Sequence, residues 1–341
     1  NTDVGYLALL ANTTGASNVA VGAYALDANT TASNNTAVGY ASLGANTTGT
    51  FNTALGRQAL LLNTTADNNV AVGGGALTAN TTGTSNTAVG YLALTTNTTG
   101  TSNAAVGAYA LDANTTGSSN TAVGKSSLGA NTTGSDNTVL GFEALLVATT
   151  ATGNTAVGKN AGKAITTGTA NTFLGGGAGD STDDGNYNTA IGSGALSANC
   201  GNSNVAIGTS AAIACTGASN TVMGTNSGYA LTSGGNNLFI GLDSGRTGSP
   251  GGNITTGSNE IVLGDENITE AHIQVDWTVA SDARDKTDFT ALDLGLDFVK
   301  DLQPVTYKWD KRSKYGDKSA EDYDLNAQTP DGTHKEDWLD I

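Results

Sequence analysis

The sequence predicts a mainly β fold: a parallel β-solenoid or β-roll of about sixteen rungs of 17 residues, with a small α+β segment at the C-terminus. The main observation is that an Asn-Thr-Ala-Val-Gly segment, or a variant of it, recurs at a fixed short period, which means that one structural unit is stacked on itself. A second observation is a sharp change in charge density near Gly264. The opening Asn of each rung falls at Asn1, Asn18, Asn35, Asn52, Asn69, Asn86, Asn103, Asn120, Asn137, Asn154, Asn171 and Asn188, then with broken spacing at Asn204, Asn220, Asn237 and Asn259.

Each rung can be interpreted by position, counted from its opening Asn. In the rung 86–102, positions two and four are Thr87 and Val89, and this alternation is typical of a short strand. Position nine is usually Leu, as at Leu94, and forms a second apolar column. We therefore expect two short strands and two turns per rung, around a narrow core of Ala, Val, Thr and one Leu.

Glycine and asparagine mark the expected turns. Position five is Gly from Gly5 to Gly264, which predicts a positive φ or a backbone approach too close for a Cβ atom. The Asn-Thr-Thr-Gly segment at positions 12 to 15 predicts a turn whose Asn and Gly are left-handed.

The predicted core is thin, and this bears on assembly. Rungs spaced by ~4.8 Å make a rod of roughly 75–80 Å. Burial of apolar area contributes about 25 cal/mol/Å² to stability, and each rung buries little of it. We expect neighbouring chains to cover an apolar side of the rod, most simply in a homotrimer.

Charge divides the chain into regions. Residues 1–264 carry 11 acidic and 5 basic side chains, whereas residues 265–341 carry 19 and 9. The prediction is a repetitive shaft over 1–264, a connecting strand region over 265–280 and a C-terminal domain that begins at 281.

Composition also excludes some partners. The net charge of −16 argues against nucleic acid, which needs clustered Lys and Arg. Eighteen consecutive apolar residues occur nowhere, so we expect no membrane insertion. The only Met is Met223, and no secretory signal precedes Asn1, so we expect the chain to be an internal piece of a longer polypeptide.

The rungs resemble a known kind of repeat. The segments Ser17–Gly22 and Ser203–Gly208 read Ser-Asn-Val-Ala-Val-Gly and Ser-Asn-Val-Ala-Ile-Gly. They are similar to the head repeats of trimeric autotransporter adhesins, which form left-handed parallel β-rolls in a trimer. The period is longer here, so we expect the Asn-Thr-Thr-Gly turn to be an enlarged loop.

The C-terminal residues follow a different pattern. Apolar residues alternate over Ala271–Ala280, as in a strand with one buried face. A helical apolar stripe then runs from Phe289 to Leu302, stops before Pro304, and is followed by a strand over Val305–Trp309.

With the Ser-Asp-Ala-Arg-Asp-Lys segment at 281–286, this order resembles the start of the intramolecular chaperone auto-processing domain of phage tail fibres, tailspikes and endosialidases. The family domain continues beyond the point that corresponds to Ile341. In that family the domain trimerises, helps the upstream fibre to fold, and is then cut off by its own chain.

The resemblance implies a self-cleavage site. Ser281 matches the nucleophile and Lys286 its base, with Asp282 and Arg284 in support, and the cut would fall near Ala280–Ser281. A Ser-Lys dyad works only if burial or assembly lowers the pKa of the lysine. This would be a single-turnover maturation event, so we do not expect an enzyme that acts on outside substrates.

Three functions remain open. The first is a viral tail fibre or appendage that projects toward and binds a bacterial surface polysaccharide or protein receptor; it would be assembled in the host cytoplasm, joined to other virion tail proteins and located in the virion tail. The second is a bacterial cell-surface adhesin or extracellular filament. The third is a fibre-borne polysaccharide hydrolase, whose active site would lie outside this chain because the rod has few carboxylates to pair.

Several other residues have a structural and a functional interpretation. Cys200 and Cys215 lie at similar places in successive rungs, and we expect free thiols. A calcium site or, in preference, a solvated loop is suggested by Asp180, Asp183 and Asp184. The spacing of a metal site is not found around His272 or His334. We therefore expect no bound metal and no cofactor.

The Asn-Thr-Thr segments form a column of glycosylation sequons along the rod. They are either glycan sites or, more simply, side-chain ladders of a tight turn. Their threonines also suggest the hypothesis of an ice-binding surface. This hypothesis is disfavoured because such a surface needs a flat array on a strand, whereas these threonines lie in the predicted turns. The sequons lie at Asn12, Asn29, Asn46, Asn63, Asn80, Asn97, Asn114 and Asn131.

Overall fold

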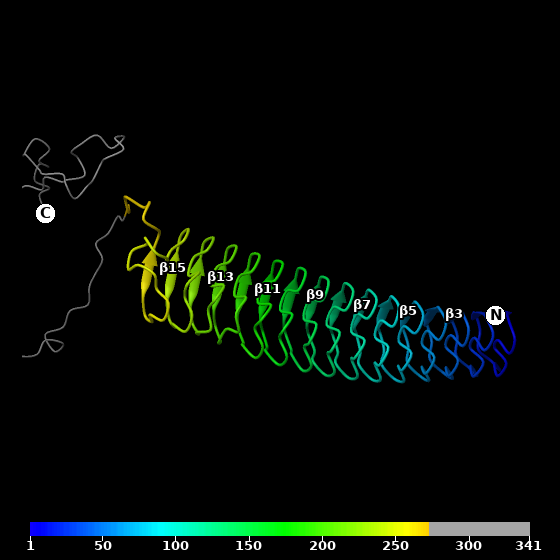
Figure 1. Cartoon of the computed structure of the whole chain (residues 1–341). Coiled ribbons are helices and arrows are strands. Elements are labelled where there is room, and N and C mark those ends of the chain that lie inside the picture. Colours follow the sequence, from blue (N-terminus) through cyan, green and yellow to red (C-terminus); the bar gives the residue numbers. More distant parts are fainter. Residues whose placement is uncertain (273–341) are drawn as a thin grey trace, which may run out of the picture. The chain divides into compact units, whose positions relative to one another are not determined.

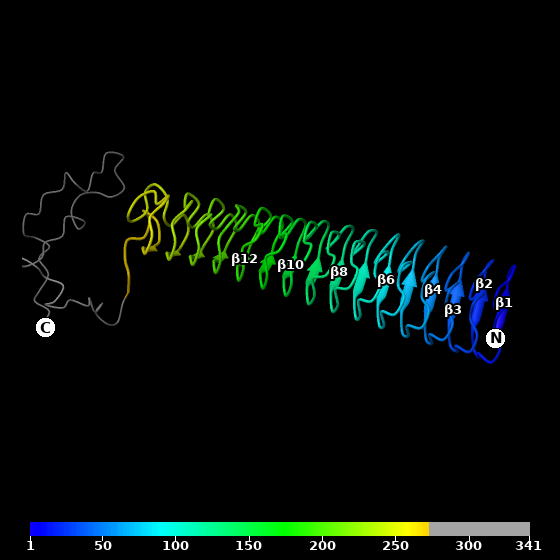
Figure 2. The same ribbon diagram turned by 90° about the horizontal axis from the view of Figure 1, so that it is seen from below.

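A computed structural model of the chain describes residues 1–272, which form a β-solenoid shaft. Each rung contributes one strand of three residues, and the strands pair in parallel and in sequence order into a single sheet of 16 strands (Figures 1 and 2). The predicted parallel solenoid is therefore confirmed. The strands are β1 Thr2–Val4, β2 Val19–Val21, β3 Thr36–Val38, β4 Thr53–Leu55, β5 Val70–Val72, β6 Thr87–Val89, β7 Ala104–Val106, β8 Thr121–Val123, β9 Thr138–Leu140, β10 Thr155–Val157, β11 Thr172–Leu174, β12 Thr189–Ile191, β13 Val205–Ile207, β14 Thr221–Met223, β15 Leu238–Ile240 and β16 Ile261–Leu263.

The expectation of two strands per rung is wrong. In the rung 86–102 the strand β6 is followed by consecutive turns, and Leu92 and Leu94 have φ angles of 53° and 50°. Left-handed residues at alternate positions cannot continue a strand. The second apolar column, at position nine, is therefore carried by a turn whose leucine points into the core.

The composition of the core also differs from the expectation. A three-residue strand points one side chain inward and two outward. In β6 the inward residue is Ala88, which is fully buried, whereas Val89 is 36% exposed. The core therefore consists of Ala at positions three and eight with Leu at position nine, and Thr and Val of the strand face outward.

The glycine at position five meets both conditions expected of it. Gly90 has a φ of 144°, and a Cβ atom on it would lie 2.5 Å from the carbonyl oxygen of Gly107 in the next rung. The expectation for the Asn-Thr-Thr-Gly turn is wrong, however. In this rung the residues with positive φ are Gly90, Leu92, Leu94 and Ser102, and they include neither the Asn nor the Gly of that turn.

The opening asparagines form a buried ladder along the shaft. The backbone N–H of Asn35 donates to Oδ1 of Asn18 at 3.0 Å, and Nδ2 of Asn35 donates to the carbonyl of Gly49 at 2.9 Å. Equivalent bonds recur along the shaft, for example at Asn52 and Asn86. Bonds to the neighbouring rungs and to a carbonyl of the same rung thus satisfy these asparagines, as buried amides require. Among the opening asparagines of residues 1–272 the exception is Asn188, whose Nδ2 is buried without a partner.

A second ladder is formed by the asparagines at position 12. Nδ2 of Asn80 donates to Oδ1 of Asn63 at 2.9 Å and to the carbonyl of Gly83 at 2.9 Å. The ladder ends at Asn131, because the next rung has Ala148 at this position. Oδ1 of Asn131 is consequently buried without a hydrogen-bond partner.

This ladder supports a comparison of two variants. Asn80→Ala should leave Oδ1 of Asn63 without its donor and so give this ladder a second buried unsatisfied oxygen, which costs about 1–3 kcal/mol. Asn131→Ala only moves the existing orphan to Asn114, so it should cost less by about that amount. Hydrogen exchange of the flanking amides would measure both; equal losses of protection would contradict the ladder account.

The core changes character in the second half of the shaft. In the strand β11 the inward position holds Phe173 instead of Ala, and the position-nine leucines of the preceding rung and of its own rung are replaced by Gly162 and Gly179. A Cβ atom at Gly179 would lie 2.5 Å from the ring of Phe173, and one at Gly162 would lie 2.8 Å from it. The glycines therefore make room for the ring. Phe239 is accommodated by Gly228 and Gly245 in the same way.

The last rung is longer than the others. Leu238 pairs with Ile261, so the rung that begins at Asn237 has 23 residues. The backbone N–H of Glu260 donates to Oδ1 of Asn237, and Asn259 has the left-handed φ of position 17. The expected opening residue, Asn259, is therefore wrong by one place, and Glu260 occupies the first position.

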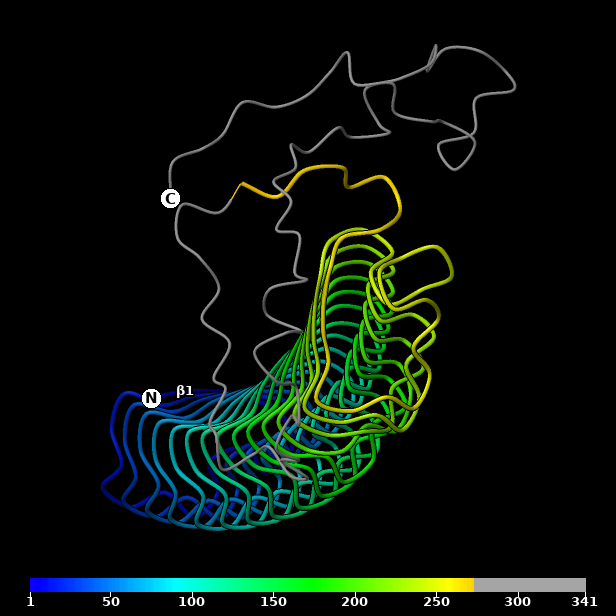
Figure 3. The same ribbon diagram turned by 90° about the vertical axis from the view of Figure 1, so that its left-hand side faces the viewer.

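The shaft twists along its length. Seen end on, successive rungs are rotated relative to one another, and the first and last rungs differ clearly in direction (Figure 3). Parallel strands twist in this way because of the chirality of the backbone. The outward face of the sheet consequently follows a winding path around the shaft.

Candidate functional site: the outer face of the sheet and the end of the shaft

The outward face of the sheet carries two apolar or weakly polar columns. Position two is mostly Thr or Val, and position four is Val, Leu, Ile or Met from one end of the shaft to the other. The position-four residues among the large exposed apolar side chains are Val4, Val38, Leu55, Val89, Val106, Leu140, Leu174, Met223, Ile240 and Leu263. An exposed apolar stripe of this length is unusual on a monomer and is typical of an interface.

No element of residues 1–272 covers this face. The strands contact only their neighbours in the sheet, and the turns close the rung on the opposite side of the buried alanines. The sequence analysis missed this assignment because it placed Val and Thr in the core. The available signal was position three, which is Ala in most rungs and is enlarged to Phe only where glycines compensate.

Seven of the eight sequon asparagines are not accessible for glycosylation in the folded shaft, and Asn12 in the first rung is half-buried. Asn29 to Asn131 in this column are fully buried, and their Nδ2 atoms donate to the preceding asparagine and to a backbone carbonyl. Nδ2 is the atom to which a glycan would be attached. The structure therefore supports the interpretation as a side-chain ladder.

The two cysteines are buried and free, as expected. Burial raises the pKa of the Cys215 thiol to about 11 and raises that of Cys200 as well. The Sγ atom of Cys200 lies 3.2 Å from Oγ1 of Thr182. Because the thiolate is the reactive form, these protonated side chains are suited to packing.

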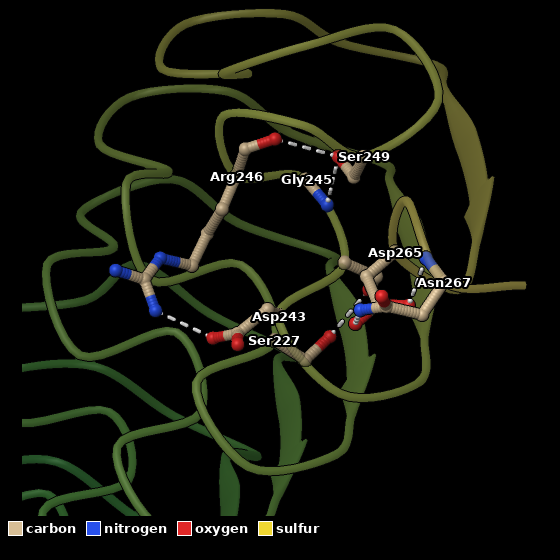
Figure 4. A network of polar contacts seen from close by, with 8 residues as sticks. Ser227, Asp243, Gly245, Arg246, Ser249, Asp265 and Asn267 are labelled. Atoms are coloured by element: carbon tan, nitrogen blue, oxygen red, sulfur yellow. Dashed lines mark hydrogen bonds and ion pairs between the residues drawn. The ribbon is translucent and has the colours of Figure 1, made fainter. Parts of the chain in front are cut away.

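The described end of the shaft is an ordered loop (Figure 4). Asp243 forms a salt bridge with Arg246, and the guanidinium lies 4.9 Å from the ring centroid of Tyr229. Oγ of Ser249 donates to the carbonyl of Arg246 at 2.8 Å and accepts from the N–H of Gly245 at 3.0 Å. These bonds hold the extra residues of the last rung in place beside the strand β16.

The remaining polar residues do not assemble a metal site within residues 1–272. Oδ1 of Asp183 accepts from Thr166, and its backbone N–H donates to Oδ1 of Asn199 at 3.0 Å. His272 is exposed, with Nε2 at 3.5 Å from Oε2 of Glu270. No group of three His, Cys, Asp or Glu side chains in this part is placed to hold a metal ion. Nor does this part contain a helix long and apolar enough to cross a membrane.

The predicted self-cleavage residues lie outside the described residues. They are Ser281 and Lys286 with Asp282 and Arg284, and the scissile bond would be near Ala280–Ser281. The same holds for His334 and for the helix and strands expected between residues 273 and 309. These assignments stay predictions from the sequence.

Comparison with known proteins gives one family. Residues 281–328 match the family model described as "Chaperone of endosialidase". The match begins at Ser281, the first residue of the segment that the sequence analysis assigned to such a domain. Neither the curated proteins nor the solved structures contain a significant match to the chain. A β-solenoid shaft followed by a match to this chaperone family fits a tail-fibre-like protein with a C-terminal chaperone.

Proposed function

We propose that this chain is the distal part of a homotrimeric viral tail fibre or appendage. Its shaft projects toward a bacterial surface and binds there, and its C-terminal domain assists trimerisation and folding before it is cut off. The observation that carries the proposal is the combination of an uncovered apolar sheet face along the whole shaft with a chaperone-of-endosialidase match directly after it.

The outer face of the sheet supplies the contact between protomers. In a trimer, three shafts can turn their apolar columns toward a common axis and so bury position four of every rung. Cyclic symmetry closes the assembly, so the apolar face of each protomer is covered. The inward alanines are too small to make a thick core, so burial of the outward Val, Leu and Ile adds the missing apolar area. The number three comes from the resemblance to trimerising chaperone domains and adhesin heads.

The C-terminal domain performs the maturation step. The neutral amine of Lys286 accepts the proton of the Ser281 hydroxyl, and Oγ attacks the carbonyl carbon of Ala280. The C–N bond between Ala280 and Ser281 breaks, and its nitrogen leaves as an amine with the proton from Lys286. Water then hydrolyses the ester between Ala280 and Oγ, which gives the free carboxylate of Ala280 and restores the Ser281 hydroxyl. The lysine is neutral only if its pKa is depressed, and assembly of the trimer is the event that buries it. Cleavage then reports that folding is complete.

The test is an intact-mass measurement on the protein expressed with its complete C-terminus. The wild type should lose everything after about Ala280, whereas Ser281→Ala and Lys286→Ala should keep the full mass. Lys300→Ala is the matched control and should cleave like the wild type. If all four proteins keep the full mass, self-cleavage is wrong, and residues 281–341 are a permanent tip of the fibre.

A bacterial surface adhesin is the second candidate, because the rungs resemble adhesin head repeats. It shares the shaft and the trimer with the fibre but has no use for a domain that is cut away. The same mass measurement therefore separates the two candidates, and removal of the C-terminal domain favours the fibre.

A further inference from the structure

Aromatic and cationic side chains gather on one column of the shaft, next to the outer face of the sheet. They come from positions six and seven, directly after the glycine that ends each strand. The first cluster holds Tyr6, Tyr24 and Tyr40, with Arg57 in the following rung. The ring centroids of Tyr6 and Tyr24 lie 5.5 Å apart at an interplanar angle of 83°, and those of Tyr24 and Tyr40 lie 5.8 Å apart at 79°.

A second cluster repeats the first one 85 residues further along the chain, which is five regular rungs. Tyr91 and Tyr109 are 5.5 Å apart at an angle of 88°, as their counterparts Tyr6 and Tyr24 are. In the next rungs, Nζ of Lys125 lies 5.9 Å from the ring centroid of Phe142. With rungs ~4.8 Å apart, the two clusters are spaced by about 24 Å along the shaft.

The backbone holds these side chains at a fixed spacing. The N–H at position seven donates to the position-six carbonyl of the preceding rung, as from Tyr24 to Tyr6 at 2.9 Å and from Tyr109 to Tyr91 at 3.0 Å. Such bonds make the column rigid before any ligand arrives, which lowers the ordering cost of binding.

The rings are also available for contact. Tyr40 of the first cluster and Tyr91 of the second are 49% and 55% exposed. An exposed tyrosine offers an apolar ring face together with a hydroxyl that can donate and accept.

The cations of the shaft concentrate on the same column. Only five basic residues occur in residues 1–264, and three of them, Arg57, Lys125 and Lys159, stand at position six. None of these three forms a salt bridge within the described part of the chain, whereas Lys163 pairs with Glu143 and Arg246 with Asp243. Unpaired cations among aromatic rings, on an otherwise acidic shaft, complement an anionic ligand.

We propose that this aromatic–cation column binds an acidic polysaccharide that lies along the shaft. Pyranose rings pack their C–H faces on the tyrosines and on Phe142, and the uronate or other carboxylate groups pair with Arg57 and Lys125. The proposal rests on host-surface binding as the function of the fibre and names the chemical class of the receptor. Two clusters on each chain bind one polymer together, so modest affinities combine by avidity.

The test is affinity electrophoresis of the wild-type trimer in gels that contain hyaluronan, alginate or polygalacturonate, with dextran as the neutral polymer. At least one acidic polymer should slow the wild type, and dextran should not. Tyr91→Ala/Tyr109→Ala and Arg57→Ala/Lys125→Ala should each weaken the retardation by about tenfold. Phe51→Ala/Tyr187→Ala is the matched control, because these aromatics are 60% and 66% exposed at position 17, and it should behave like the wild type.

Several results would overturn the proposal. One is a trimer that none of the acidic polymers slows, and another is equal retardation of the wild type and the column variants. If the column variants become monomers in sedimentation, the column belongs to the protomer contact and not to a receptor site. If a poly(dT) oligonucleotide binds the column better than the saccharides do, the ligand class is wrong. Each result leaves the Ser281→Ala mass measurement intact, so the fibre assignment is judged separately.

Discussion

Replacing Val89 and Val106 with Asp should convert the proposed homotrimer into monomers with folded shafts. Both side chains are outward residues of neighbouring strands, 36% and 40% exposed in the single chain. In a monomer their carboxylates would be solvated, so the rungs should keep their fold. In a trimer each would be buried against an apolar neighbour, and an uncompensated buried charge costs about 3–5 kcal/mol.

Sedimentation velocity would measure the assembly, and circular dichroism the fold. Thr99→Asp/Thr116→Asp is the matched control, since it adds the same two charges to the exposed turns of the same two rungs. The control should stay trimeric. A trimer that survives both pairs of substitutions would show that the outer face of the sheet is not the contact between protomers.

Gly179→Leu should destabilise the shaft strongly. The triple variant Gly162→Leu/Phe173→Ala/Gly179→Leu should regain most of the lost stability. Leu is the normal residue at position nine and adopts the same left-handed conformation there: φ is 50° at Leu94 and 61° at Gly179. The backbone therefore tolerates the substitution, and the obstacle is the ring of Phe173. Overpacking of this kind costs about 1–3 kcal/mol, and Phe173→Ala alone should cost about 3–5 kcal/mol through its cavity.

The triple variant recreates the Ala, Leu and Leu arrangement of the first rungs, so its stability should approach that of the wild type. Hydrogen exchange across residues 154–187 would follow the local unfolding, because stacked rungs open regionally. Losses that simply add in the triple variant would contradict volume compensation between these three positions. The result would also show whether rungs of the two types are interchangeable.

The period of the sequence was sufficient to predict the architecture, but not the direction of the side chains. A repeat of Asn and Gly at fixed positions reports stacking, whereas Thr87, Ala88 and Val89 form too short a strand for periodicity to tell the inward side from the outward side. Hydrophobicity alone favoured Val89 as the core residue. The narrow interior of the rung has room only for a small side chain at this strand, and the buried residue is Ala88. The expected second strand failed for a related reason: an apolar column predicts burial, and Leu94 reaches the core from a left-handed turn.

One candidate site could be predicted from the sequence, and the other could be recognised only in the structure. Ser281 and Lys286 were found from a linear motif, which needs no geometry, and the family match begins at this motif. The aromatic–cation column was missed because its members alternate between positions six and seven and are separated by 16 to 18 residues within each cluster. Only the stacking of the rungs brings Tyr6, Tyr24 and Tyr40 together.

The asparagine ladders have a consequence for how such a chain can fold at all. The opening asparagine of a rung is satisfied only in part by its own rung. Nδ2 of Asn35 donates to Gly49 of the same rung, but its backbone N–H needs Oδ1 of Asn18 and its Oδ1 needs the N–H of Asn52. A solitary rung would leave the backbone N–H and Oδ1 of this asparagine without these partners, so we expect a rung to be stable only against a neighbouring rung. We expect growth from a template at one end, rung upon rung, and a trimerising domain at the C-terminus would supply that starting surface to three chains at once.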